Sequence, residues 1–440
     1  MEANPSFVTW FRKSSPYIHA HRNKTFVIFF GGEALLDDDF DHLVHDFALL
    51  SSLGIRLVLV HGIRPQIDQR LKNLQIAPAF HKHLRITDHL ALQCVKEAAG
   101  TVRVEIEALL SMGLTNTPMA GYGLKVCSGN FVVAKPIGVI EGIDYCHTGE
   151  VRRVDAVAIN QHLNQNNLVL ISPIGYSPSG EVFNLSAERV ATAVAIALKA
   201  EKLILLTEQS CYDPADNRQI QQMTAAEADH FLNLHPELPD TVQLPLCAAI
   251  QSCRAGVNRV HLIDRNTDGA LLLELFTHNG IGTLISATPF EELRAADLND
   301  IGGIVELIKP LEQQGILAKR DREKIEMEIA DYMIIERDGL IVACSALHPD
   351  PQAEFGVLAC LAVHPNYQKS ARGHRLLETA YHKARHLKLK KLFVLSTQTM
   401  HWFLERGFLP ADINVLPEPL KKRYNPARNS KILYKDVNYP

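Results

Sequence analysis

Short apolar runs of strand length that alternate with helical segments dominate the first half of this chain. Residues 26–30 form one such run and residues 55–60 form another. Between them, apolar side chains recur at helical spacing over residues 40–53, and Gly54 ends the predicted helix. A buried strand, a helix and a second buried strand in this order are typical of parallel strands joined by a crossover helix.

The same alternation continues toward residue 285. Further buried strands are predicted at residues 131–134, 168–172, 202–206 and 260–263, and an Ala-rich helix at residues 187–199 precedes the third of them. The pattern predicts an α/β fold with a mostly parallel sheet and helices on both of its faces.

The composition narrows the class of protein. A length of 440 residues predicts two or three domains, and 47% hydrophobic with 21% charged residues is typical of a folded globular chain. Charged residues before the first apolar run disfavour a signal peptide, and every apolar run is far shorter than the roughly 20 residues of a membrane span. The eight cysteines contain no CxxC pair. We therefore expect a cytoplasmic protein with reduced cysteines and without metal, membrane or nucleic-acid partners.

A different pattern begins near residue 288, after a turn-rich stretch. Asp338-Gly339 between two apolar runs predicts an antiparallel hairpin. The predicted elements are helices at residues 298–314 and 320–329, hairpin strands at 332–337 and 340–348, a strand at 356–363, a helix at 373–387, a strand at 391–396 and a helix at 400–405. Together they predict an α+β domain of about 150 residues.

One junction of the second block has the chemistry of an anion site. The strand at residues 356–363 leads through a loop of small residues to the start of the helix at 373–387. Backbone N–H groups and the positive end of the helix dipole attract phosphates at such a point, and Arg372 adds a guanidinium suited to phosphate oxygens. We expect a diphosphate to bind here. An ordinary strand-to-helix turn is the alternative interpretation.

This junction resembles motif A of GNAT-type acetyltransferases, Gln/Arg-x-x-Gly-x-Gly/Ala, and residues 402–408 resemble the family's aromatic-x-x-x-Gly-Phe segment. In motif A the defining positions hold Gln368, Ala371 and Gly373, and Ala371 stands where many members have glycine. The resemblance implies acetyl-CoA as co-substrate, threaded between two splayed strands. The implied contacts to the pantetheine arm are backbone groups of Cys360, Leu361, Ala362 and Val363, and those to the diphosphate are Gln368, Lys369, Ser370, Ala371, Arg372 and Gly373.

The resemblance implies direct transfer without a metal. A deprotonated amine attacks the thioester, a backbone N–H meets the oxyanion, and an acid protonates the thiolate. Phe403 stands where the family has its usual acid, a tyrosine, which leaves Ser396, His401 or departure of the thiolate as an anion. Val357 stands where the family commonly has a glutamate base, which leaves Glu354 or loss of the amine proton to solvent.

The first block resembles the three-layer amino-acid kinase fold and is closest to N-acetylglutamate kinase. The resemblance rests on Gly31-Gly32, His61-Gly62 and the segment from Asn184 to Glu188. Phe29 stands where active kinases have a phosphate-neutralising lysine, and Glu188 stands where they have the catalytic aspartate. A phenyl ring cannot neutralise a transferring phosphoryl group. We therefore expect a kinase fold without kinase chemistry.

The bacterial two-domain N-acetylglutamate synthases join such a silent domain to an acetyltransferase, and the chain resembles them over nearly its whole length. The implied organisation is an N-terminal arm at residues 1–24, a kinase-like domain at 25–285 and an acetyltransferase domain at 286–440. The implied reaction is acetyl transfer to the α-amine of L-glutamate in arginine biosynthesis. An active acetylglutamate kinase and a non-catalytic arginine-binding regulator are the alternatives.

The resemblance also implies two ligand sites and an assembly. Feedback by L-arginine is implied at Tyr17, Glu274, Gly280, Gly282 and Thr283. Anchors for the two carboxylates of glutamate are implied at Lys319 or Arg320, the two possible registers, and at Arg428 and Ser430. A charged, solvated surface is the alternative for these residues. The apolar arm implies a homo-oligomer, although it could instead pack on its own domain.

Overall fold

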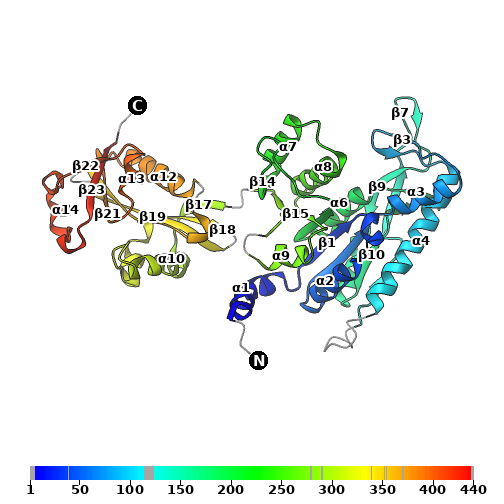
Figure 1. Ribbon diagram of the computed structural model, residues 1–440, viewed down its shortest axis with the longest axis horizontal. Helices are drawn as coiled ribbons and strands as arrows, with labels where there is room; N and C mark the ends of the chain where they lie inside the picture. The colour runs from blue at the N-terminus through cyan, green and yellow to red at the C-terminus, as the bar shows by residue number, and fades with distance from the viewer. Residues whose placement is uncertain are drawn as a thin grey trace. The chain divides into compact units, whose positions relative to one another are not determined.

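The computed structural model describes residues 5–37, 39–112, 123–277, 280–288, 291–337, 339–350, 352, 354–368 and 371–437. The chain forms two compact units, Met1–Pro289 and Phe290–Pro440, and each is described by itself (Figure 1).

An eight-stranded sheet forms the centre of unit 1. Its strands are β1 (Thr25–Phe30), β2 (Arg56–His61), β5 (Val126–Cys127), β10 (Leu168–Ile171), β13 (Lys202–Thr207), β14 (Gln222–Thr224), β15 (Arg259–Asp264) and β16 (Thr283–Ser286). Their order is β14-β16-β15-β13-β1-β2-β10-β5, and each adjacent pair is parallel except β15–β16. The predicted mostly parallel sheet is confirmed.

Helices cover both faces of this sheet (Figure 1). One face carries α2 (Phe40–Ser52), α3 (Arg64–Asn73), α4 (His89–Ser111) and α9 (Ala270–Phe276), and the other carries α5 (Ala156–Asn164), α6 (Ala187–Leu198), α7 (Ala225–Leu234) and α8 (Asp240–Arg254). In β1, Val27 and Phe29 pack against the second set, whereas Phe26, Ile28 and Phe30 pack against the first. Because both faces are covered, every residue of β1 is buried, which explains its continuous apolar run.

Smaller elements border the main sheet of unit 1. They are the 3-10 turn η1 (Gly32–Leu36), a second sheet of β12 (Val182–Asn184), β11 (Ile174–Tyr176), β6 (Val132–Pro136) and β9 (Gly149–Val154), and the hairpins β3 (Phe80–His81) to β4 (Leu84–Arg85) and β7 (Val139–Ile140) to β8 (Ile143–Asp144).

The N-terminal arm is the helix α1 (Pro5–His21), and its C-terminal half packs on unit 1. The Ser14 hydroxyl donates to the Phe276 carbonyl over 2.9 Å, and His21 Nε2 lies 2.9 Å from the Leu275 carbonyl oxygen. Both acceptors belong to the last turn of α9. Trp10 and Phe11, one turn earlier, are 42% and 52% exposed.

Unit 2 is built on a seven-stranded sheet. Its strands are β17 (Glu291–Ala295), β18 (Tyr332–Arg337), β19 (Leu340–Asp350), β20 (Phe355–Val363), β21 (Lys391–Ser396), β22 (Leu409–Ala411) and β23 (Lys431–Asp436). The order is β17-β18-β19-β20-β21-β23-β22, and β20–β21 is the one parallel pair among the described strands of this sheet. The predicted α+β architecture is confirmed.

The two faces of this sheet carry different helices. α10 (Ile301–Gln313) and α11 (Arg322–Met327) pack on one face, and α12 (Arg372–His386) packs on the other. The remaining elements are α13 (Met400–Leu404), α14 (Glu418–Arg423) and the 3-10 turns η2 (Leu298–Asp300), η3 (Ile329–Asp331), η4 (Pro365–Tyr367), η5 (Ile413–Val415) and η6 (Pro426–Arg428).

The structure differs from the sequence prediction at the start of unit 2. We expected a turn followed directly by a helix, but β17 comes first. Its charged residues hide the strand pattern, because edge strands tolerate charge. Arg294 holds β17 in place through ion pairs with Asp300 at 2.7 Å and Glu336 at 2.6 Å.

In the part of the chain that the structure describes, the helices are all too short or too polar to cross a lipid bilayer. The described residues also contain no cluster of three or more histidine, cysteine, aspartate or glutamate side chains arranged to hold a metal ion.

Candidate active site

The strands β20 and β21 separate half-way along their length. They pair from Phe355 with Lys391 as far as Leu358 with Val394. Beyond this point β20 stays paired with β19 up to Val363, and β21 stays paired with β23 up to Ser396. In the described sheet, the β21-facing edge of residues 359–363 is therefore left to other partners. The four predicted pantetheine contacts, residues 360–363, lie on this segment.

A β-bulge lies where the two strands separate. Cys360 has φ of 54°, and the β19–β20 register shifts between Cys344 and Ala346. A non-glycine residue at positive φ costs on the order of 1–3 kcal/mol and is retained where packing enforces it. Here the Cys344 thiol donates to the Cys360 carbonyl over 3.5 Å, and both side chains are buried. The bulge turns the backbone groups of residues 360 and 361 out of the regular ladder.

The α12 loop, residues 364–371, connects β20 to α12. Gln368 Nε2 donates to the Val363 carbonyl over 3.3 Å, which ties the loop to the end of β20. Ala371 has φ of −64°, a conformation that alanine adopts without strain, so this position does not need the glycine of other family members. A Cβ on Gly373 would lie 3.3 Å from the Trp402 ring, so this position is crowded. The predicted contacts Lys369 and Ser370 lie outside the described residues.

The structure gives the Arg372 guanidinium a different partner from the predicted phosphate. Its Nε donates to both carboxylate oxygens of Glu291 over 2.9 Å, and its Nη1 donates to the Tyr367 carbonyl over 2.8 Å. The side chain is 12% exposed. The group that Arg372 presents at the start of α12 is its backbone N–H, because the first N–H groups of a helix have no acceptor within the helix.

Three segments meet on the other side of the gap. Arg428 Nη2 donates to the carbonyls of Gly315 over 3.0 Å and Ile316 over 3.2 Å, and the Thr397 hydroxyl donates to Ile316 over 3.1 Å. The loop after α10, the end of β21 and the turn η6 are thereby held together. The predicted anchor Ser430 lies two residues after η6 and directly before β23.

Lys319 and Arg320 are the two alternative anchors, and their surroundings differ. Lys319 is exposed, whereas Arg320 is half-buried and its backbone N–H is held by Glu312 Oε1 at 2.9 Å. The charge of Arg320 also affects the pKa values of two buried groups, Tyr332 and Cys360. Burial raises the pKa of Tyr332, and Arg320 opposes this rise; the Cys344 thiol lowers the pKa of Cys360, and Arg320 adds to this effect. Arg320 is therefore the more buried of the two cations, and its Nη1 donates to the Ala318 carbonyl over 3.1 Å.

The three predicted catalytic side chains differ in their burial and in their place along the strands. Ser396 lies two residues past the last β20–β21 pair, on the part of β21 that no longer pairs with β20, and it is buried. Its hydroxyl accepts from the Thr399 N–H over 3.0 Å and lies 2.9 Å from Thr399 Oγ1. His401 is exposed on α13. Glu354 precedes β20, at the opposite end from the α12 loop, and its carboxylate is ion-paired with Lys390.

Sequence reasoning missed Thr399 and Glu291. Thr399 follows Ser396 in a Ser-x-x-Thr pattern directly after a strand, a spacing that predicts a local hydrogen bond and could have revealed it. Glu291 lies on a strand that was not predicted, and the sequence carries no local signal of its partner 81 residues away.

In unit 1, Glu274 on α9 is fully engaged with its surroundings. Its Oε2 accepts from the backbone N–H groups of Ile281 over 2.7 Å and Gly282 over 2.8 Å, and its Oε1 lies 2.6 Å from His261 Nδ1. Burial acts to raise its pKa, but the hydrogen bonds from His261, Gly282 and Ile281 outweigh burial and lower the pKa to about 2. Glu274 is therefore a carboxylate at neutral pH, and it holds the loop after α9 in place.

Two of the other predicted arginine contacts, Gly280 and Gly282, lie against this carboxylate. Gly280 has φ of 60°, and a Cβ there would lie 2.3 Å from Glu274 Oε2; one on Gly282 would lie 2.5 Å from the Leu262 carbonyl. The Thr283 hydroxyl donates to the Ile220 carbonyl over 2.5 Å. Tyr17 lies on α1, the helix that packs on α9. The structure thus places Gly280 and Gly282 beside Glu274, whereas the Thr283 hydroxyl bonds a different group and Tyr17 belongs to α1.

Because unit 1 contains two buried histidines, we expect acid to lower its free energy of unfolding. Burial lowers the pKa of His61 to about 4, and burial with the Lys202 charge lowers that of His261 to about 4. Between pH 6.5 and 4, these two histidines bind more protons in the unfolded chain than in the folded one. The free energy of unfolding should therefore decrease as the pH is lowered through this range, by up to about 3 kcal/mol for His61 alone. Calorimetric unfolding at several pH values measures this slope.

The variant His61→Gln should flatten that slope, because glutamine can still bond Ser172, 2.9 Å from His61 Nε2, but does not titrate. His45→Gln, at an exposed position on α2, is the matched control and should leave the slope unchanged. An equal slope in His61→Gln and the parent chain would refute this explanation.

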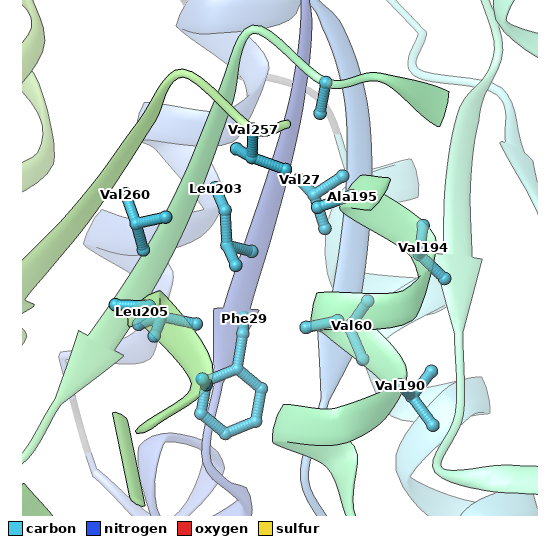
Figure 2. Close-up of a cluster of buried hydrophobic side chains, with 14 of the residues drawn as sticks. Val27, Phe29, Val60, Val190, Val194, Ala195, Leu203, Leu205, Val257 and Val260 are labelled. Atoms are coloured by element: carbon cyan, nitrogen blue, oxygen red, sulfur yellow. The ribbon is translucent and has the colours of Figure 1, made fainter. Parts of the chain in front are cut away.

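The position of the missing kinase lysine is apolar. Phe29 is 5% exposed and lies in the cluster formed by Val60, Leu205 and Val190, as Figure 2 shows. It also lines a cavity of about 320 Å³ together with Gly32 and other residues of the two Gly-containing turns. Phe29 itself therefore brings no charge to this cavity, whose lining also contains Arg64, Lys82, Arg85 and Arg189.

Comparison with known proteins agrees with both units. Residues 24–263 match the amino acid kinase family, and residues 303–408 match the acetyltransferase (GNAT) family. An amino-acid acetyltransferase from Pseudomonas paraeruginosa is 50% identical over 435 residues, which cover 98% of this chain and 100% of that protein.

Two solved structures are similar over 98% of this chain and 100% of their own. N-acetylglutamate synthase from Neisseria gonorrhoeae complexed with coenzyme A and L-arginine is 38% identical, with a TM-score of 0.89. The same synthase complexed with coenzyme A and N-acetyl-glutamate is 39% identical, with a TM-score of 0.63. The chain therefore belongs to the two-domain amino-acid acetyltransferases, enzymes that join an amino-acid-kinase-type domain to a GNAT domain that uses acetyl-CoA.

Proposed function

We propose that this enzyme transfers the acetyl group of acetyl-CoA to the α-amine of L-glutamate, and that L-arginine bound to unit 1 inhibits it. The observation that carries the proposal is the separation of β20 and β21 beyond Leu358 and Val394, which leaves an unpaired strand edge between them in the described sheet. The ligands of the Neisseria synthase, coenzyme A with N-acetyl-glutamate or with L-arginine, support the same assignment.

The residues at the gap fit a coenzyme A molecule. The free edge of residues 359–363 can pair with the amides of a pantetheine arm, and the start of α12 offers backbone N–H groups to a diphosphate. Gly373 keeps this helix start open, since the Trp402 ring already occupies the adjacent space. When bound, acetyl-CoA would supply a thioester that an amine can attack.

The bulge at Cys360 provides the oxyanion donor in this proposal. A backbone N–H turned out of the ladder is available to the carbonyl oxygen of the acetyl group, and a donor of this kind costs no reorganisation during the reaction. Arg320 and Arg428, with Ser430, hold the two carboxylates of glutamate, because guanidinium groups bind carboxylates bidentately.

Proton transfer does not involve Glu354 in this proposal. Its carboxylate is ion-paired with Lys390 at the far end of β20, and Val357 has no titratable group. The amine loses its proton to solvent before it attacks. The thiolate departs as an anion that accepts a hydrogen bond from the Ser396–Thr399 hydroxyl pair, and it then takes up, through solvent, the proton that the amine releases on becoming an amide; the exposed His401 is not needed.

Arginine acts through the region around Glu274. Loss of one bond from this carboxylate would free the loop from Gly280 to Thr283, so a guanidinium that competes for Glu274 changes the loop directly. The exposed Trp10 and Phe11 on α1 also present apolar surface, and we propose that a second subunit covers it.

A thiol-release assay tests the function. The purified full-length chain is incubated with acetyl-CoA and each of the twenty amino acids, and free thiol and acetylated product are measured. L-glutamate should give thiol and N-acetyl-L-glutamate, and millimolar L-arginine should lower the rate, whereas L-lysine at the same concentration should not.

Two outcomes would contradict the proposal. Thiol release with glutamate that does not exceed the acetyl-CoA blank would exclude the reaction, and a faster reaction with another amino acid would reassign the acceptor. Consumption of ATP that depends on N-acetylglutamate would revive the kinase interpretation, which the apolar position of Phe29 opposes.

A further inference from the structure

A buried carboxylate of unit 2 is surrounded by three arginines at the start of α12. Glu291, the first residue of β17, has a side chain that is 8% exposed. Arg372 Nε binds both of its oxygens at 2.9 Å, and Arg372 Nη2 bonds it as well. Arg337 lies 3.6 Å and Arg375 3.7 Å from the same carboxylate. Removing one partner of a buried ion pair leaves an uncompensated charge in the interior, which is strongly destabilising.

Arg372 joins this carboxylate to the α12 loop. Its Nη1 donates to the Tyr367 carbonyl over 2.8 Å, and its guanidinium lies 5.2 Å from the centre of the Tyr367 ring. Tyr367 ends η4 on one side of the loop, and Arg372 begins α12 on the other. One guanidinium, held by Glu291, therefore holds both ends of the segment that faces the diphosphate.

We propose that Glu291 is a positioning residue of the acetyl-CoA site. It acts through Arg372, which it keeps directed inward, so that Tyr367 and the first backbone N–H groups of α12 are held in position for the diphosphate. The inference rests on the use of acetyl-CoA and deepens it.

The variant Glu291→Gln tests the inference. It should weaken coenzyme A binding to the full-length enzyme, measured by titration calorimetry, and raise KM for acetyl-CoA by about tenfold, since a charge-assisted bond that orders the loop is lost. The kcat at saturating acetyl-CoA and KM for the amino-acid acceptor should change less than about twofold. The matched control is Glu292→Gln on the exposed side of β17, which should behave as the parent enzyme.

Arg372→Lys provides a second route if Glu291→Gln folds poorly. Lysine keeps the charge but cannot bond Glu291 in a fork and Tyr367 at the same time. It should weaken coenzyme A to the same extent as Glu291→Gln, and the double variant should show no further loss.

Several results would overturn the inference. Unchanged coenzyme A affinity in Glu291→Gln, or tighter binding because the released Arg372 reaches the phosphates, would exclude a positioning role. An equal fall in kcat with no change in KM for acetyl-CoA would assign Glu291 to general stability. The failure of this inference remains distinct from that of the proposed function, because calorimetry requires no acceptor. A parent enzyme without coenzyme A binding would refute both.

Discussion

Replacement of Arg320 with glutamine should lower kcat/KM for L-glutamate by about 10²-fold, because a charge-assisted hydrogen bond to a carboxylate contributes about 1.5–3 kcal/mol. The effect should appear mainly as a higher KM for glutamate, with KM for acetyl-CoA unchanged. Steady-state thiol release over a range of glutamate concentrations measures both constants. Arg320 is suited to this role because it is half-buried, with its backbone held by Glu312.

Lys319→Gln is the matched control for this experiment. Lys319 is the adjacent cation on the same segment, but it is exposed. Its removal should change kcat/KM by less than about threefold, as is usual for a solvated charge. A larger loss of kcat/KM in Lys319→Gln than in Arg320→Gln would show that Lys319, rather than Arg320, binds a carboxylate of glutamate.

The variant Gly373→Val should raise KM for acetyl-CoA by at least about 10²-fold. A misplacement of about 1 Å at a binding site can have this cost. A Cβ at this position already lies 3.3 Å from Trp402, and a branched side chain must either displace this ring or project toward the diphosphate. Coenzyme A titration and acetyl-CoA kinetics both report the effect.

Gly302→Val separates this effect from the general cost of valine in a helix. Gly302 lies in the first turn of α10, and a Cβ there meets no atom within 4 Å. This variant should retain the parent KM for acetyl-CoA. Normal coenzyme A affinity in Gly373→Val would mean that the diphosphate binds away from the start of α12.

The architecture of both units follows from local patterns of the sequence. Strands buried on both faces, such as β1 and β13, are continuous apolar runs, and α12 follows its strand at the expected place. Motif A could be identified because its spacing is local. β17 could not be predicted, since its residues are charged and it is stabilised by distant partners such as Glu336.

The candidate sites were only partly predictable for the same reason. Ala371 departs from the family motif, and the structure shows a φ of −64° that makes glycine unnecessary there. Glu274 was predicted as a ligand contact, but its bonds to Ile281 and Gly282 show that it also orders a loop. The sequence can name the chemical group at such a position but not its neighbours.

The sequence by itself determined the two-domain architecture, the position of the loop before α12 and the loss of the kinase lysine at Phe29. These are local properties of spacing and residue type. Only the tertiary structure decided that Arg372 binds Glu291 instead of facing outward, that Arg320 is half-buried whereas Lys319 is exposed, and that β20 and β21 separate beyond Leu358 and Val394. Such pairings depend on burial and on segments far apart in the chain, and folding brings them together.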